Sequence, residues 1–95
     1  MFRADLRQIA EITGGRLAFS EPGLVVQGLS TDSRQVRPGQ LFVALKGDRF
    51  DGHDYVDSAR QAGAAAALVE REVSSPIPQV VVDDTLIALG KLGQW

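Results

Sequence analysis

Three short apolar runs constrain the fold of this chain more than any other feature: Leu41–Leu45, Ala64–Val69 and Gln79–Val82. Runs of this length bounded by turn residues are typical of buried strands. Small residues recur at helical spacing over 55–62, between the first two runs, and Gly63 provides a stop for that helix. A helix that connects two strands usually places them parallel in one sheet. The sequence therefore predicts an α/β domain, a small mixed sheet with helices packed against it.

The residues before these runs predict a helix and a hairpin. Asp5 is suited to cap a helix over 6–13, in which apolar side chains recur on one face. The glycine pair at 14–15 is a fitting C-terminal stop for it. Two short strands within residues 14–29 are separated by an adjacent proline and glycine, which is typical of a turn. We therefore expect a β-hairpin over 14–29 that adds antiparallel strands to the sheet.

The C-terminal residues predict one more helix, which begins at Thr85 and is capped by Asp83 or Asp84. Its alternation of apolar and polar residues continues up to Trp95, without the cap or polar tail that usually ends a domain. A chain of 95 residues has room for one domain. We therefore expect residues 1–95 to be a single N-terminal domain taken from a longer protein.

Composition excludes several classes of protein. Ten basic and twelve acidic residues give a net charge of −2, whereas nucleic-acid binders usually carry a basic excess. The absence of cysteine excludes disulfide scaffolds, thiolate zinc sites and thiol nucleophiles. No apolar run approaches the roughly 18 residues of a membrane span, and the N-terminus lacks the apolar region of a secretory signal. The expectation is a cytoplasmic protein that neither inserts into membranes nor binds nucleic acid.

The polar loop over 46–54 is a candidate anion site. Its two glycines have the Gly-x4-Gly spacing of a P-loop, but that motif continues with Lys and Ser or Thr, and here His53 and Asp54 follow. We therefore reject nucleoside triphosphate binding at this loop. A glycine-bearing loop between a strand and a helix still exposes backbone N–H groups to an anion, and Lys46 and Arg49 add positive charge. An ordinary turn is the alternative.

A second polar segment, Ser30–Arg34, directly follows a predicted strand. Its hydroxyl and charged groups are suited to hydrogen-bond a ribose or a base edge. The alternative, which the residues alone favour, is a turn in which the side chains of Asp32 and Ser33 bond their own backbone. Phe50 is the one apolar residue of the other loop, and we expect it to pack into the core rather than offer its ring to a planar ligand.

His53 is the only histidine, and a lone histidine does not make a metal site. We expect a structural role for it, as a cap of the 55–62 helix. The alternative is an acid–base cluster with Asp51 and Asp54, which would make the chain a small phosphate-binding enzyme. No nucleophile with a matching partner accompanies these residues, so the structural role is favoured.

Two motif blocks in a fixed order resemble the N-terminal domain of the Mur ligases: T-D-S-R followed by P-G, and then L-F-V-A-L-K-G-D-R-F-D-G-H-D-Y. The likeness spans nearly the whole chain. The form R-F-D-G-H-D-Y resembles the branch that adds D-alanyl-D-alanine to UDP-N-acetylmuramoyl-tripeptide; the alternative is the branch that adds the third amino acid. The resemblance implies a role in cytoplasmic peptidoglycan precursor synthesis, and so in cell-wall biogenesis, cell shape and cell division.

The resemblance also implies a division of labour between domains. This domain would hold the UDP end of the substrate, whereas ATP, Mg and D-alanyl-D-alanine would be bound by central and C-terminal domains absent from these residues. No catalytic, metal or cofactor residue can be assigned here, so the fragment alone should be inactive. A stand-alone interaction domain without catalysis is a further alternative.

The site residues follow from the two motif blocks and from the charge of Lys46. Ser33 matches the serine that the family places near the uracil and ribose, and Thr31 and Arg34 flank it. The segment 47–50 matches the one that approaches the diphosphate. The predicted UDP-binding set is Thr31, Ser33, Arg34, Lys46, Gly47, Asp48, Arg49 and Phe50.

Overall fold

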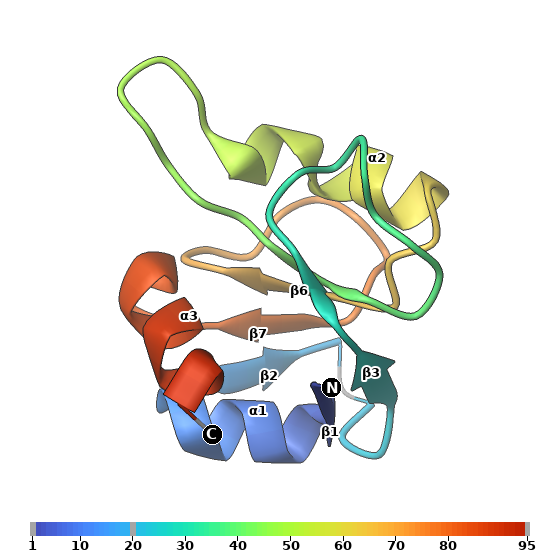
Figure 1. The fold of residues 1–95 in the computed structure, drawn as a ribbon, viewed down its shortest axis with the longest axis vertical. Coiled ribbons are helices and arrows are strands. Elements are labelled where there is room, and N and C mark those ends of the chain that lie inside the picture. Colours follow the sequence, from blue (N-terminus) through green and yellow to red (C-terminus); the bar gives the residue numbers. More distant parts are fainter. Residues whose placement is uncertain (1, 20, 95) are drawn as a thin grey trace.

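The three apolar runs form adjacent parallel strands of one sheet, as the sequence predicts. The computed structural model describes residues 2–19 and 21–94. Along the chain (Figure 1) the elements are β1 (Arg3–Asp5), α1 (Leu6–Thr13), β2 (Arg16–Ala18), β3 (Val25–Gln27), β4 (Leu29–Ser30), β5 (Leu41–Val43), the short 3-10 helix η1 (Gly52–Tyr55), α2 (Val56–Gln61), β6 (Ala66–Val69), β7 (Gln79–Val81) and α3 (Thr85–Gln94).

The main sheet has the strand order β2-β7-β6-β5-β4. The four strands from β4 to β7 are parallel, and β2 joins the β7 edge antiparallel. This arrangement confirms the predicted mixed α/β sheet. Since the carboxyl ends of parallel strands lie at one edge of a sheet, the segments that follow β4, β5, β6 and β7 come together there.

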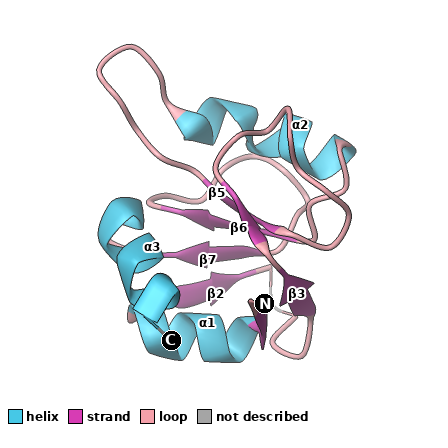
Figure 2. Ribbon diagram, viewed as in Figure 1, coloured by secondary structure: helices cyan, strands magenta, loops and turns pink. Residues whose placement is uncertain are grey.

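The helices cover the two faces of the sheet. Figure 2 shows the strands between α2 on one side and α1 with α3 on the other. Successive strand residues point to opposite faces, so Leu41 and Val43 of β5 pack in the core under α1 and α3. Phe42 and Ala44 pack instead in the core under α2. Both predicted helices, over 6–13 and 55–62, therefore lie against the sheet, but on opposite faces.

The predicted helix caps are largely confirmed. The Asp5 carboxylate accepts the Gln8 backbone N–H at 2.8 Å, and the Gln8 side chain accepts the Asp5 N–H at 3.0 Å. This reciprocal pair is a capping box that satisfies two helix-terminal donors. Gly14 ends α1 with a φ of +73°, which favours glycine. At α3 the cap is Asp84, whose carboxylate accepts two backbone N–H groups.

The predicted hairpin over 14–29 is wrong. β2 pairs with β7, whereas β3 pairs antiparallel with β1 in a separate two-stranded sheet. The turn residues permit a reversal of the chain between β2 and β3, but each of these strands pairs with a segment far away in the sequence and not with the other. β1 itself was not predicted. Residue 20, in the predicted turn, and Trp95, where the last helix was expected to continue, lie outside the described residues.

Candidate functional site

The two polar loops predicted as sites meet at the carboxyl edge of the parallel strands. Thr31 directly follows β4, and Lys46 lies shortly after β5. Two clefts open there, of about 700 Å³ and 620 Å³, and both are lined by Thr31 and Phe50. In open α/β sheets, ligands bind at this edge. The structure therefore brings most of the predicted residues to one continuous region.

The first cleft is lined by both hydroxyl side chains of the predicted site, Thr31 and Ser33. Among the described residues, neither the Thr31 nor the Ser33 hydroxyl has a hydrogen-bond partner, so both are available to a ligand. Its full lining is Thr31, Asp32, Ser33, Arg34, Phe50, Tyr55 and Ser58.

The segment 30–34 is also a self-bonded turn, as the alternative predicted, through Asp32 but not through Ser33. Asp32 Oδ1 accepts the Arg34 backbone N–H at 2.9 Å. The other local bond is made by Ser30 and not by Ser33: the Ser30 hydroxyl donates to the Asp32 carbonyl at 3.0 Å. The Arg34 guanidinium donates to both oxygens of Asp32. These bonds hold the pKa of Asp32 below its usual value and raise that of Arg34.

The expectation that Phe50 packs into the core is wrong. Its side chain is 46% exposed and stacks on Tyr55, with the ring centroids 5.2 Å apart and an interplanar angle of 13°. The cause is the shape of the 46–51 loop, in which Lys46 and Asp51 form an antiparallel bridge and the Gly47 N–H donates to the Phe50 carbonyl. The loop projects away from the sheet (Figure 1), which carries Phe50 out of reach of the core.

The second cleft adds residues that the motifs did not include. Lys46 and Gly47 belong to the predicted set, whereas Glu70, Asp84 and Thr85 do not. A topological signal was available for these three, because Glu70 directly follows β6 and Asp84 lies shortly after β7. The cleft is lined by Thr31, Leu45, Lys46, Gly47, Phe50, Glu70, Asp84, Thr85 and Leu86.

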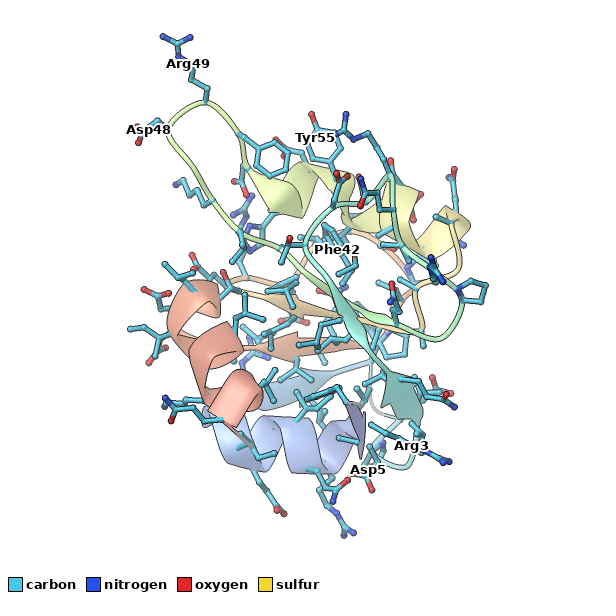
Figure 3. All side chains as sticks on the ribbon, viewed as in Figure 1. Arg3, Asp5, Phe42, Asp48, Arg49 and Tyr55 are labelled. Atoms are coloured by element: carbon cyan, nitrogen blue, oxygen red, sulfur yellow. The ribbon has the colours of Figure 1, made fainter. Side chains whose placement is uncertain are left out.

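Asp48 and Arg49 are not brought to either cleft. Both are exposed at the tip of the projecting loop, and Figure 3 shows their side chains directed away from the body of the domain. Neither lines the cleft that contains Lys46 and Gly47. A ligand that extends beyond the two clefts would have to pass along the loop to reach them.

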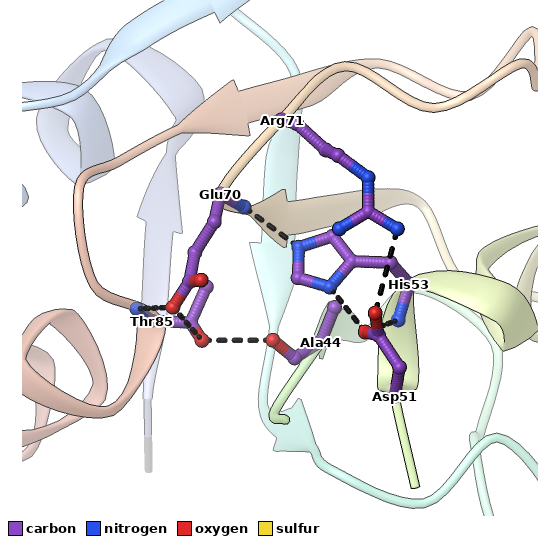
Figure 4. A network of polar contacts seen from close by, with 6 residues as sticks. All are labelled: Ala44, Asp51, His53, Glu70, Arg71 and Thr85. Carbon is purple, nitrogen blue, oxygen red and sulfur yellow. Dashed lines mark hydrogen bonds and ion pairs between the residues drawn. The ribbon is translucent and has the colours of Figure 1, made fainter. Parts of the chain in front are cut away.

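His53 is buried and structural, but it is not the predicted helix cap. The N-cap of α2 is Tyr55, which makes no side-chain cap bond. Asp51 caps the preceding η1 instead, since its carboxylate accepts the His53 backbone N–H at 2.9 Å. The imidazole lies between Asp51 Oδ1, 2.6 Å from Nδ1, and the Glu70 backbone N–H, 2.8 Å from Nε2 (Figure 4). With both ring nitrogens engaged and 0% of its side chain exposed, His53 is not accessible for acid–base chemistry on a ligand.

Gly52 explains why a glycine stands at the end of the P-loop-like spacing. A Cβ at this position would lie 2.8 Å from the Leu45 backbone N and O and 3.0 Å from Ala44 Cα. The Gly52 N–H donates to the Leu45 carbonyl at 2.7 Å. The glycine therefore serves close backbone packing that closes the 46–51 loop, and not phosphate binding.

The described residues do not fit an ATP–Mg site. The 46–54 loop lacks the Lys and Ser or Thr of a P-loop. Within 2–19 and 21–94 no group of three or more His, Cys, Asp or Glu side chains is arranged to hold a metal ion. Among the helices in the same ranges, none is long and apolar enough to cross a membrane.

Comparison with known proteins points to one family. Residues 11–92 match the model described as Mur ligase family, catalytic domain. The whole chain is 42% identical to the UDP-N-acetylmuramoyl-tripeptide--D-alanyl-D-alanine ligase of Escherichia coli K12 and covers 21% of that protein. Over 66 residues, 70% of this chain, it is 50% identical to the UDP-N-acetylmuramoyl-L-alanyl-D-glutamate--2,6-diaminopimelate ligase of Aquifex aeolicus, covering 14% of that protein.

The fold agrees with a solved structure. A crystal structure of MurF from Acinetobacter baumannii matches 98% of this chain with a TM-score of 0.90 at 37% identity. The chain covers 21% of that structure. The described domain thus spans about a fifth of the length of the relatives that it matches from end to end.

Proposed function

This chain belongs to the Mur ligase family, and from that premise we propose that it is the UDP-binding N-terminal domain of a ligase that adds D-alanyl-D-alanine to UDP-N-acetylmuramoyl-tripeptide. The observation that carries the proposal is the convergence of the two motif blocks on two adjoining clefts that share Thr31 and Phe50. Chain segments far apart in sequence meet there at the carboxyl edge of the parallel strands.

In this proposal the uridine occupies the first cleft. The free hydroxyls of Thr31 and Ser33 hydrogen-bond the ribose and the base edge. The stacked pair of Phe50 and Tyr55 provides an aromatic wall, since both rings line the cleft and are 46% and 42% exposed. Arg34 is held by Asp32 at the same cleft and is oriented before a ligand arrives.

The diphosphate follows toward the second cleft. Lys46 and Gly47 line it, and the Lys46 ammonium group suits phosphate oxygens. Asp48 and Arg49 belong to the proposed set as the outer end of the same loop. Arg49 lies at the tip, so its contact would be made to a part of the ligand that leaves the clefts.

Two patterns in the comparisons support the D-alanyl-D-alanine branch over the branch that adds the third amino acid. The full-length matches bear the name of the D-alanyl-D-alanine ligase, in Escherichia coli and in Haemophilus influenzae. The relatives named for diaminopimelate addition match about 70% of this chain. In the whole enzyme, which we place in the cytoplasm, ATP and Mg act through other domains, and the 95 residues alone are expected to catalyse nothing.

The experiment that tests the proposal is calorimetric titration of the 95-residue chain with UDP, with ADP as the control nucleotide. We expect UDP to bind and ADP to bind more weakly, because the base edge is read in the first cleft. Ser33→Ala should raise the dissociation constant about twofold to tenfold, the effect of one neutral hydrogen bond. Ser74→Ala, at an exposed serine away from both clefts, is the matched control. Equal binding of UDP and ADP, or no effect of Ser33→Ala, would contradict the assignment.

A further inference from the structure

The polar network around His53 is not used by the proposed ligand contacts, yet it connects both sides of the second cleft. His53 comes from η1, at the end of the projecting loop, and Glu70 follows β6. Their contact joins residues 17 positions apart. A buried polar side chain with every hydrogen-bonding atom satisfied is costly to replace, because its partners are left unpaired.

The contacts determine where the imidazole carries its proton. Nε2 lies 2.8 Å from the Glu70 backbone nitrogen, which always donates, so Nε2 is the acceptor and has no proton. The proton of the neutral ring is therefore on Nδ1 and is donated to Asp51 Oδ1 at 2.6 Å. Replacement by a side chain that can only donate or only accept breaks one of these two contacts.

On the loop side, the hydrogen bond between His53 and Asp51 fixes the base of the 46–51 loop. Asp51 is bridged to Lys46 across the loop, and its other oxygen lies 3.4 Å from Arg71. The adjacent Gly52 N–H donates to the Leu45 carbonyl. A shift of His53 would therefore move Asp51, and with it Lys46 at the wall of the second cleft.

On the sheet side, the hydrogen bond between His53 and the Glu70 N–H connects the imidazole to the floor of the same cleft. The Glu70 carboxylate accepts the Thr85 backbone N–H at 2.9 Å, and the Thr85 hydroxyl donates to the Ala44 carbonyl at 2.8 Å. Figure 4 shows this path from Asp51 through His53 and Glu70 to Thr85. Glu70 and Thr85 both line the second cleft.

We propose that His53 is a positioning residue of the ligand site: as an Nδ1-protonated imidazole between Asp51 and the Glu70 amide, it sets the 46–51 loop against the floor of the second cleft. The part of this inference that concerns ligand affinity rests on the proposed function, whereas the part that concerns the loop does not. His53 itself touches no ligand, since its side chain is fully buried.

A pair of substitutions separates the two contacts. In His53→Asn the side-chain amide stands near the place of Nδ1 and keeps a donor for Asp51, but leaves the Glu70 N–H unpaired. In His53→Gln the amide oxygen stands near the place of Nε2 and keeps the acceptor, but loses the donor. Gln79→Ala is the control, because Gln79 is fully buried and bonds the backbone at 73 and 75, and lines neither cleft.

The first measurement needs no ligand. Nitrogen-15 spectra of the wild-type imidazole should show the Nδ1-protonated tautomer. Amide hydrogen exchange at Gly47 and Gly52, whose N–H groups close the loop, should be at least about tenfold faster in both His53 variants and unchanged in Gln79→Ala. An Nε2-protonated tautomer, or wild-type exchange rates in both variants, would overturn the proposal. If the variants do not fold, an Nε2-protonated ring in the wild type would still overturn the proposal.

The second measurement is the affinity for UDP. Each His53 variant should raise the dissociation constant about threefold to tenfold, with Gln79→Ala at the wild-type value after thermal melts confirm that all are folded. An equal rise in Gln79→Ala would overturn the positioning role. If wild-type chain does not bind UDP, the proposed function fails, and the exchange measurement alone decides the role of His53.

Discussion

Asp51 is the residue whose charge state is most strongly coupled to the fold. Its carboxylate accepts the backbone N–H and the imidazole of His53, and Arg71 lies near its other oxygen. These contacts, the hydrogen bonds from His53 first, lower the pKa of Asp51 from 3.8 to about 2. Because the ionised form is favoured in the folded state, its contribution to stability is present above about pH 4 and is lost as the pH falls through about 2.

Asp51→Asn should therefore destabilise the chain in a pH-dependent way. The difference in unfolding free energy between wild type and variant should be largest above pH 4 and should shrink toward pH 2, where wild-type Asp51 also becomes neutral. Urea unfolding followed by circular dichroism between pH 2 and pH 6 measures this difference. A difference that stays constant over that range would show that the Asp51 charge is not what stabilises the loop.

At the scale of single residues, the sequence indicated part of the lining of the clefts. The segment 30–34 alone favoured a turn, and the resemblance of its motif to the family added Thr31 and Ser33 to the predicted set, both of which line the first cleft. Tyr55 ends the second motif block but was left out of the predicted set, and Ser58 lies outside both blocks. They come from η1 and α2, and the crossover from β5 through α2 places them beside Ser33. Phe50 was misplaced because its apolar character favours the core, whereas the projecting loop and the stacking on Tyr55 keep it outside.

Helix α1 is the element for which local sequence and structure agree best. Asp5 and Gln8 form a capping box, and Gly14 closes the other end. Asp5→Ala removes one partner of that box, and loss of an N-cap costs about 0.5–2 kcal/mol. For a domain of this size that corresponds to a melting temperature lower by roughly 2–16 °C, at about 4–8 °C per kcal/mol.

Thermal melts of Asp5→Ala and Asp5→Asn test this prediction, since asparagine is as good an N-cap as aspartate and should keep most of the stability. The affinity for UDP should not change, because α1 lies on the face of the sheet opposite α2 and lines neither cleft. Equal melting temperatures for wild type and Asp5→Ala would contradict the role of the capping box.

Parallel strand pairing was predictable most directly where a helix connects the strands. The connection from β5 through α2 to β6 makes parallel neighbours of these strands, as expected from its length and composition. No such rule governs β2 and β3. β2 pairs with β7 in the main sheet, and β3 pairs with β1 in a separate two-stranded sheet. A local turn signal carries no information about partners this far along the chain.

At the scale of the whole molecule, the site is a product of topology. The four parallel strands end at one edge, and each contributes a segment to the two clefts. A ligand that bridges both clefts contacts segments after β4, β5, β6 and β7 together. It should therefore stabilise the domain as a unit, because a ligand that binds only the folded state raises the free energy of unfolding.

Saturation with UDP should raise the melting temperature substantially. At a free concentration of 100 times the dissociation constant, the gain is about 2.7 kcal/mol, or roughly 10–20 °C for a domain of this size. Uridine occupies only the first cleft in our proposal, so at the same concentration its shift should be smaller. Lys46→Ala, at the wall of the second cleft, should reduce the UDP shift toward that of uridine and leave the uridine shift unchanged.

Differential scanning fluorimetry across a range of ligand concentrations measures these shifts, and Arg16→Ala is a suitable control. Arg16 is also an exposed basic residue, its ion pair with Glu72 lies at the β2 edge of the sheet, and it lines neither of the two clefts. Arg16→Ala removes a positive charge away from both clefts and should therefore leave the UDP-induced rise in melting temperature unchanged. Equal shifts with uridine and UDP in the wild type would mean that the second cleft does not take the phosphates, and that the two clefts do not act as one site.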